Sequence, residues 1–149
     1  EFLKSYFDKF PEIKDYMNKT INFCRKSGYV NNIFGRRCYI TGINDKNYNV
    51  RNFQERAAIN APIQGSAADI MRLAMIRIQQ ALDKNSGCKT KMLLQIHDEL
   101  VFETPKNEIQ KITPIIKKIM SDVSSSEHHQ FSTPLTVDIN SGNNWGEAH

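Results

Sequence analysis

Hydrophobic and polar positions alternate in segment 92–103, on both sides of the polar stretch His97, Asp98 and Glu99. The apolar members of the pattern are Met92, Leu94, Ile96, Leu100 and Phe102. A period of two residues is typical of β-strands, in which successive side chains point to opposite faces. The segment therefore predicts a β-hairpin that carries two acidic residues at its tip.

Other segments repeat their apolar residues at intervals of three and four positions, which is typical of amphipathic helices. Segments 2–10 and 11–27 do so on either side of Pro11, a residue that suits the first turn of a helix. Gly28 then ends the second pattern. Segment 105–123 carries isoleucines at the same spacing. We expect a helix in each of these three segments.

Further extended segments complete the expected fold. Segments 29–33 and 37–40 flank a turn at Gly35, and they predict a second, shorter hairpin. Segment 41–52 is polar and predicts an exposed loop. Alternation in segment 135–139 predicts a last strand. The fold class is therefore α+β, with helices packed on a small antiparallel sheet.

Segment 51–84 predicts a helix with an interruption at Pro62, which lacks an N–H and disfavours the helical conformation of the residue before it. We expect the first helix to end there, with Gln64 in a bend and Ser66 capping a second helix. Arg56 and Asn60 are four positions apart and share a face. These three long polar side chains suit the acceptors of the DNA minor groove, although a solvated helix face is the alternative.

Length, charge and cysteine content narrow the class of protein. A chain of 149 residues can form one ordinary domain that buries roughly 70% of its unfolded surface. Lys and Arg number 20 against 16 acidic residues, and a pI near 9.0 weakly favours a polyanionic partner. The three separated cysteines indicate neither a disulfide framework nor a zinc site. No apolar run approaches the roughly 20 residues of a membrane span, so we expect no membrane partner.

The acidic residues at the tip of segment 92–103 are candidates for metal binding. A turn directs a carboxylate away from its sheet, and Mg²⁺ prefers oxygen ligands such as that of Asp98. Polar residues in a solvated turn are the alternative interpretation.

Two long motifs resemble the C-terminal portion of family A DNA polymerases, and together they span much of the centre of the chain. They are ERAAINAPIQGSAADI at 55–70 and QIHDELVFE at 95–103. The closing GNNWGEAH at 142–149 and GRR at 35–37 are also similar to that family. The resemblance implies a right-hand polymerase, with residues 1–50 as the tail of the fingers and residues 51–149 as the C-terminal palm with the catalytic hairpin.

The resemblance also implies roles for individual residues. By position in the motifs, Asp98 corresponds to a catalytic aspartate that binds metal, and Glu99 to the adjacent acid with a less direct part in catalysis. His97 corresponds to a residue near the primer terminus. The residues that correspond to contacts with the primer-template minor groove are Arg56, Asn60 and Gln64.

The activity that this resemblance implies is template-dependent nucleotidyl transfer to a primer 3′-hydroxyl, in DNA replication and repair. Two Mg²⁺ ions about 4 Å apart would serve it, one activating the primer oxygen and one stabilising the leaving pyrophosphate. The implied partners are primer-template DNA and deoxynucleoside triphosphates. The implied location is the nucleoid of a bacterial cytoplasm or, alternatively, a DNA-containing organelle.

Two motifs of the family are missing from these 149 residues. We find no D-Y-S-x-I-E-like strand that would carry another catalytic aspartate, and no R-x-x-x-K-x-x-x-F-G-x-x-Y-G-like helix that would grip the triphosphate. The helical pattern also begins at once, at Phe2, as in a chain cut from a longer one. We therefore expect this chain to be inactive alone and to self-associate through open sheet edges.

Two other functions remain as alternatives. One is a non-catalytic module, or a subunit of a split polymerase, that holds duplex DNA through the Arg56 face. The other is a metal-dependent nuclease that uses His97, Asp98 and Glu99, although it needs further carboxylates and a base.

Overall fold

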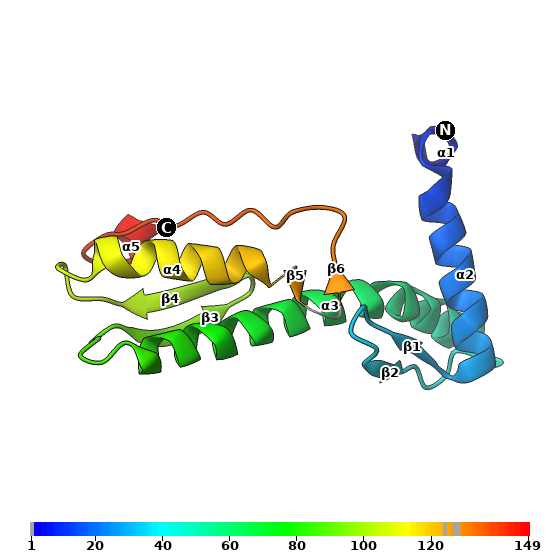
Figure 1. Ribbon diagram of the computed structural model, residues 1–149. Helices are drawn as coiled ribbons and strands as arrows, with labels where there is room; N and C mark the ends of the chain where they lie inside the picture. The colour runs from blue at the N-terminus through cyan, green and yellow to red at the C-terminus, as the bar shows by residue number, and fades with distance from the viewer. Residues whose placement is uncertain (1, 124, 127–128) are drawn as a thin grey trace. The chain divides into compact units, whose positions relative to one another are not determined.

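The computed structural model describes residues 2–123, 125–126 and 129–149 (Figure 1). Helices and short antiparallel strands divide into two compact units, Glu1–Ser66 and Ala67–His149, and the long helix α3 contributes residues to both. The mixed α+β class is thus confirmed. The elements in chain order are α1 Phe2–Lys9, α2 Pro11–Ser27, β1 Tyr29–Asn31, β2 Arg37–Tyr39, α3 Tyr48–Lys84, β3 Lys91–Ile96, β4 Glu99–Glu103, α4 Ile109–Asp122, β5 Ser125–Ser126, β6 His129–Gln130 and α5 Trp145–Ala148.

The first unit packs α2, the β1–β2 hairpin and the beginning of α3 around a small core. Gly28 ends α2 in the left-handed conformation, with φ of 78°, and its N–H donates to the carbonyl of Cys24 at 2.7 Å. The hairpin pairs Tyr29 with Tyr39. The buried residues that form the core are Cys24, Val30, Ile40, Ile43 and Ala58. The two predicted N-terminal helices and the first hairpin are confirmed.

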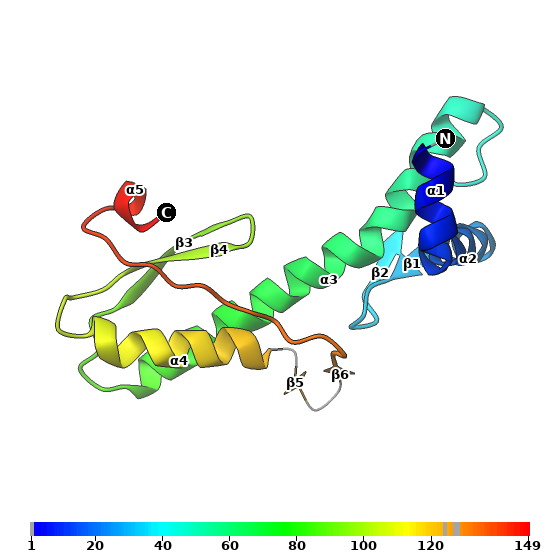
Figure 2. The ribbon, with the colours of Figure 1, turned by 90° about the horizontal axis from the view of Figure 1, so that it is seen from above.

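The second unit packs the C-terminal part of α3 against α4 and the β3–β4 hairpin (Figure 2). Its core is aliphatic because α3 and α4 each turn one apolar stripe inward. The fully or largely buried members are Ile78, Leu82, Ile112 and Ile116, and the hairpin adds Leu100 and Phe102. The predicted hairpin of segment 92–103 is confirmed, and so is the helix predicted in segment 105–123, which begins at Ile109.

The carboxylate of Glu108 joins the start of β3 to the start of α4. It accepts hydrogen bonds from the hydroxyl of Thr90 at 2.8 Å and from the backbone N–H of Lys89 at 3.0 Å. These bonds, that of the Thr90 hydroxyl first, lower the pKa of Glu108 below its ordinary value of 4.5 because they favour the ionised carboxylate.

Two expectations about regular structure are wrong. Segment 135–139 forms no strand, although Leu135, Val137 and Ile139 are still the more buried alternate residues. In the described part of the chain, strands pair only as β1–β2, β3–β4 and β5–β6, so no ladder includes this segment. The polar segment 41–52 is shorter than expected because α3 already begins at Tyr48.

The expected interruption at Pro62 is also wrong, because α3 continues from Tyr48 to Lys84 with Pro62 inside it. Ser66, expected as an N-cap, lies within the helix. Its hydroxyl donates to the carbonyl of Pro62 and accepts from the N–H of Ile33 at 3.1 Å. Asn32 also donates from Nδ2 to the carbonyl of Gly65 at 3.2 Å. These contacts bind the β1–β2 turn to α3 just beyond the proline and stabilise the helix there.

Within the residues that the structure describes, no helix combines the length and the apolar character that crossing a membrane requires.

Candidate functional site

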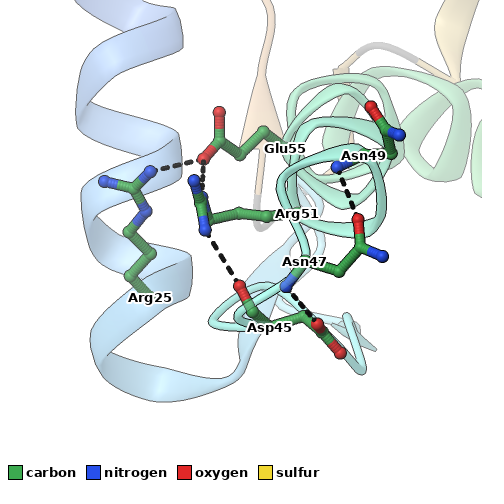
Figure 3. Close-up of polar contacts among 6 residues, drawn as sticks. All are labelled: Arg25, Asp45, Asn47, Asn49, Arg51 and Glu55. Carbon is green, nitrogen blue, oxygen red and sulfur yellow. Dashed lines mark hydrogen bonds and ion pairs between the residues drawn. The ribbon is translucent and has the colours of Figure 1, made fainter.

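The N-terminus of α3 is fixed by the polar loop before it (Figure 3). Oδ1 of Asp45 accepts from the N–H of Asn47 at 2.7 Å, and Oδ1 of Asn47 accepts from the N–H of Asn49 at 2.9 Å. The second bond satisfies a free N–H of the first helical turn, as an N-cap does. Arg51, one turn into the helix, donates to the carbonyl of Asp45 at 3.0 Å. The loop and the first turn thus support each other.

An ion-pair network attaches α3 to α2 immediately before Arg56. The carboxylate of Glu55 accepts from the guanidinium of Arg25 on α2 and lies 4.0 Å from Nε of Arg51 (Figure 3). One turn further on, the hydroxyl of Tyr16 donates to the carbonyl of Ile59 at 3.0 Å. Glu55 and Ile59 therefore mark the face of α3 that α2 covers.

Arg56 and Asn60 each follow one of these α2-facing residues, and so lie about 100° further around the helix. Both are exposed, and so is Gln64. Because Pro62 does not break α3, the three residues form one line at intervals of four positions, and by the helical rise this line is about 12 Å long. The structure thus brings the three predicted DNA-contacting residues together on one open face of an unbroken helix.

The predicted acidic tip is a two-residue turn between β3 and β4. Ile96 pairs with Glu99 at the end of the ladder, and His97 and Asp98 form the connection. Nε2 of Gln95 donates to the carbonyl of His97 at 2.7 Å and holds the turn from its own strand. A bulge between Met92 and Leu94 interrupts the ladder earlier in β3, which explains why the expected alternation of burial is imperfect there.

His97 is in the left-handed region, with φ of 52°, and it is the one residue other than glycine with positive φ in the described ranges. Positive φ at the first central position is typical of a two-residue hairpin turn in which glycine usually stands. A side chain in this conformation costs about 1 to 2 kcal/mol. Such strain is found preferentially at functional sites.

His97, Asp98 and Glu99 are all exposed at this turn. The oxygen atoms of Asp98 and Glu99 match the ligands that Mg²⁺ takes, so both carboxylates fit such an ion chemically. Among the described residues, no three side chains of His, Cys, Asp or Glu gather closely enough to form a fuller metal site. The tip therefore presents two carboxylates of suitable chemistry, fewer than a full ligand set.

One contact of the tip joins residues that are far apart in the sequence. Nδ1 of His149, just after α5, lies 3.4 Å from Oε1 of Glu99. The two residues are distant in sequence and no spacing pattern relates them, so a sequence signal for the contact is lacking. The tip and His149 belong to the second compact unit, whereas Arg56, Asn60 and Gln64 belong to the first.

Comparisons with known proteins agree along almost the entire chain. The model of the family described as DNA polymerase family A matches residues 1–147. DNA polymerase I of Streptococcus pneumoniae serotype 4 is 46% identical over 147 residues, which cover 99% of this chain and 16% of that protein. DNA polymerase I of Rhizobium leguminosarum is 45% identical over 150 residues, which cover 100% of this chain and 15% of that protein.

A solved structure is similar as well. The POL domain of Pol1 from M. smegmatis, in complex with DNA primer-template and dNTP, has a TM-score of 0.89 and 38% identity, and the match covers 98% of this chain and 25% of that chain. The chain thus spans less than a fifth of the length of the curated relatives named above.

Proposed function

Because the chain belongs to DNA polymerase family A, we propose that it forms part of the active site of a DNA-directed DNA polymerase. The observation that carries this proposal is the exposed turn that presents Asp98 beside Glu99, in a chain that the family model matches over residues 1–147. The reaction would join a deoxynucleoside triphosphate to a primer 3′-hydroxyl on a DNA template. Such an enzyme acts where DNA is, in a bacterial nucleoid or a DNA-containing organelle.

The residues of the hairpin tip would act on the reacting end of the primer. Asp98 would bind Mg²⁺, and Glu99 would add negative charge beside it. The bound metal supplies Lewis-acid stabilisation of the charge that develops on the reacting oxygens. His97 would lie against the primer terminus, where its strained backbone fixes the direction of the side chain.

The face of α3 would hold the duplex. Arg56 offers only donors, whereas Asn60 and Gln64 each offer a donor and an acceptor. The minor groove presents acceptors at every base pair, so these side chains would test the shape of the duplex without reading its sequence. The fixed N-terminus of α3 and the Arg25–Glu55 pair would keep this face rigid.

Substitution of Asp98 in the complete polymerase tests the proposed chemistry. Asp98→Ala should abolish incorporation while the affinity for primer-template changes little, because affinity depends mainly on phosphate and groove contacts. Glu103→Ala is the matched control, since Glu103 is an exposed acid at the other end of the same hairpin. A large loss of DNA binding with normal turnover would contradict the metal-binding role.

Gln64→Ala in the complete polymerase tests the groove contact. We expect weaker extension by about 1 to 3 kcal/mol, the scale of a good base-edge contact, and an equal effect on all template sequences. Gln80→Ala on an exposed position of the same helix serves as the control. Strong dependence on template sequence would refute a role at acceptors that every base pair presents.

We further propose that these 149 residues do not extend primers by themselves, because they contain neither a D-Y-S-x-I-E-like strand with another catalytic aspartate nor a triphosphate-binding helix of the family's pattern. Magnesium-dependent incorporation by the purified chain would contradict this.

The exposed Arg56, Asn60 and Gln64 favour a second candidate, a module that binds duplex DNA without catalysis. The module is favoured if the chain binds a labelled duplex and the complete polymerase still incorporates nucleotides normally when it carries Asp98→Ala.

Self-association of the chain is a related proposal. β3 and β4 pair with each other, and Leu93 and Leu94 on β3 are each 52% exposed. An open strand that carries exposed apolar residues favours pairing with a second copy. Sedimentation velocity should show a dimer that Leu93→Lys dissociates, and a concentration-independent monomer would contradict the proposal.

A further inference from the structure

The segment that carries His149 is held in a defined shape by its own side chains. Oδ1 of Asn144 accepts from the N–H of Glu147 at 3.1 Å, which caps α5. The carboxylate of Glu147 in turn accepts from the N–H of Asn143 at 2.9 Å and from Nδ2 of Asn144 at 2.8 Å. These bonds, that of the Asn143 N–H first, lower the pKa of Glu147. The short helix is thus fixed on the turn that precedes it.

Gly142 makes this fold possible. A Cβ atom at this position would lie 2.6 Å from Cβ of Glu147 and 2.9 Å from the backbone nitrogen of Ala148, closer than real Cβ contacts. Only glycine lets α5 fold back so closely on the preceding chain. Gly146 is different, because a Cβ there would meet only Oδ1 of Asn144, at 3.4 Å.

The result of this folding is the contact at the hairpin tip. His149 directs Nδ1 to within 3.4 Å of Oε1 of Glu99, and its ring lies edge-on to that of Trp145 with centroids 6.3 Å apart. The exposed fractions of the two side chains are 69% for His149 and 45% for Glu99, so solvent weakens the contact. The contact therefore matters mainly for the orientation of the Glu99 carboxylate, since a glutamate side chain otherwise samples many rotamers.

We propose that His149 is a positioning residue that holds the Glu99 carboxylate in one orientation beside Asp98. The inference rests on the proposed polymerase function, which assigns the tip its chemistry. Adjacent carboxylates repel each other, and a partner on Oε1 of Glu99 offsets part of that repulsion by restricting the Glu99 side chain. Segment 142–149 provides that partner from outside the hairpin.

Incorporation kinetics in the complete polymerase test the role. His149→Ala should lower kcat by about twofold to fivefold, the scale of an exposed pair, while KM for primer-template stays constant. His149→Gln, which keeps a hydrogen-bonding side chain, should recover much of the rate. His149→Ala should have no further effect when Glu99→Ala, which removes the acceptor, is already present. Additive losses, or no rescue by glutamine, would overturn the proposal.

A second measurement does not depend on activity. Trp145 is the single tryptophan of the chain, so its fluorescence anisotropy reports whether α5 is held in place. His149→Ala and Glu99→Ala should each lower the anisotropy in the 149-residue chain, and the double variant should add nothing. Equal anisotropy in all variants would overturn the inference. Retained incorporation by Asp98→Ala would instead refute the proposed function, and the anisotropy result would stand.

Discussion

Asn32 connects the β1–β2 turn to α3, and its replacement should destabilise the first unit. The side chain is only 8% exposed. Oδ1 accepts from the N–H of Phe34 at 3.0 Å and from that of Arg36 at 2.9 Å, while Nδ2 donates to the carbonyl of Gly65 at 3.2 Å. Asn32→Ala removes all three bonds and separates the turn from the helix next to Gln64.

The expected magnitude follows from these bonds. Each contributes about 0.5 to 1.5 kcal/mol net, and three would contribute up to about 4.5 kcal/mol. Arg36 is exposed and Phe34 only partly buried, so water replaces part of what the Oδ1 atom provided. We therefore expect Asn32→Ala to lower the free energy of unfolding by about 2 to 3 kcal/mol. Asn32→Asp keeps the acceptor but not the Nδ2 donor, and should cost about 1 to 2 kcal/mol.

Urea denaturation of the 149-residue chain, followed by far-ultraviolet circular dichroism, measures the effect. The midpoint should fall while the slope with urea stays constant, since the surface exposed on unfolding does not change. Asn31→Ala is the matched control, because Asn31 is an exposed neighbour and should change stability by less than about 0.5 kcal/mol. Equal losses for Asn31→Ala and Asn32→Ala would refute the proposed connection to α3.

Three further substitutions test the hairpin tip, an acid-sensitive contact and α5. His97→Gly should raise the free energy of unfolding by about 0.5 to 1 kcal/mol, because relief of the left-handed strain exceeds the added entropy of glycine, while incorporation by the complete polymerase falls; lower stability in urea would contradict this. Glu108 has a lowered pKa in the folded chain, so its contribution to stability is full above pH 4.5 and is lost as the pH falls through the lowered value. Glu108→Gln should therefore lower the free energy of unfolding near neutral pH and make it fall less steeply below pH 4.5. Urea denaturation at several pH values measures this, and the same decline below pH 4.5 in both proteins would count against it. Gly142→Ala should displace α5 and reduce the anisotropy of Trp145, because the added Cβ atom would lie 2.6 Å from a neighbour. Gly146→Ala should not, because the nearest neighbour of its Cβ atom is 3.4 Å away. Equal responses of the two variants would exclude a steric role for Gly142.

Local patterns predicted much of the fold because they record which side of an element is buried. Alternation predicted the β3–β4 hairpin, and Pro11 and Gly28 bounded the α2 helix. All these signals act within a few residues. The break at Pro62 was predicted by the same local reasoning and was wrong. Asn32 and Ile33 contact Gly65 and Ser66 just beyond the proline, and contacts across 33 positions do not enter a local prediction.

Local sequence patterns likewise predicted one part of the candidate site and missed another. Spacing grouped Arg56 with Asn60, whereas Gln64 was expected in a bend; the continuous helix instead places all three at intervals of four positions. The turn of His97 and Asp98 was also evident from the strands on either side. His149 has no such signal, because its partner, Glu99, lies fifty positions earlier. His149 reaches the tip because α5 packs closely against Gly142. Hydrophobic periodicity in a single sequence gives no sign of that packing.

The unbroken course of α3 constrains the number of residues between its exposed polar positions as strictly as their identities. Each residue turns the helix by about 100°, so one residue inserted between Asn60 and Gln64 would rotate Gln64 toward another face while leaving its chemistry intact. The loop between α3 and β3 has no such periodic requirement and can change length at a small entropic cost. Insertions or deletions within this face of α3 should therefore impair function as much as substitution of Gln64 does, and natural length variation is expected to fall outside the helix.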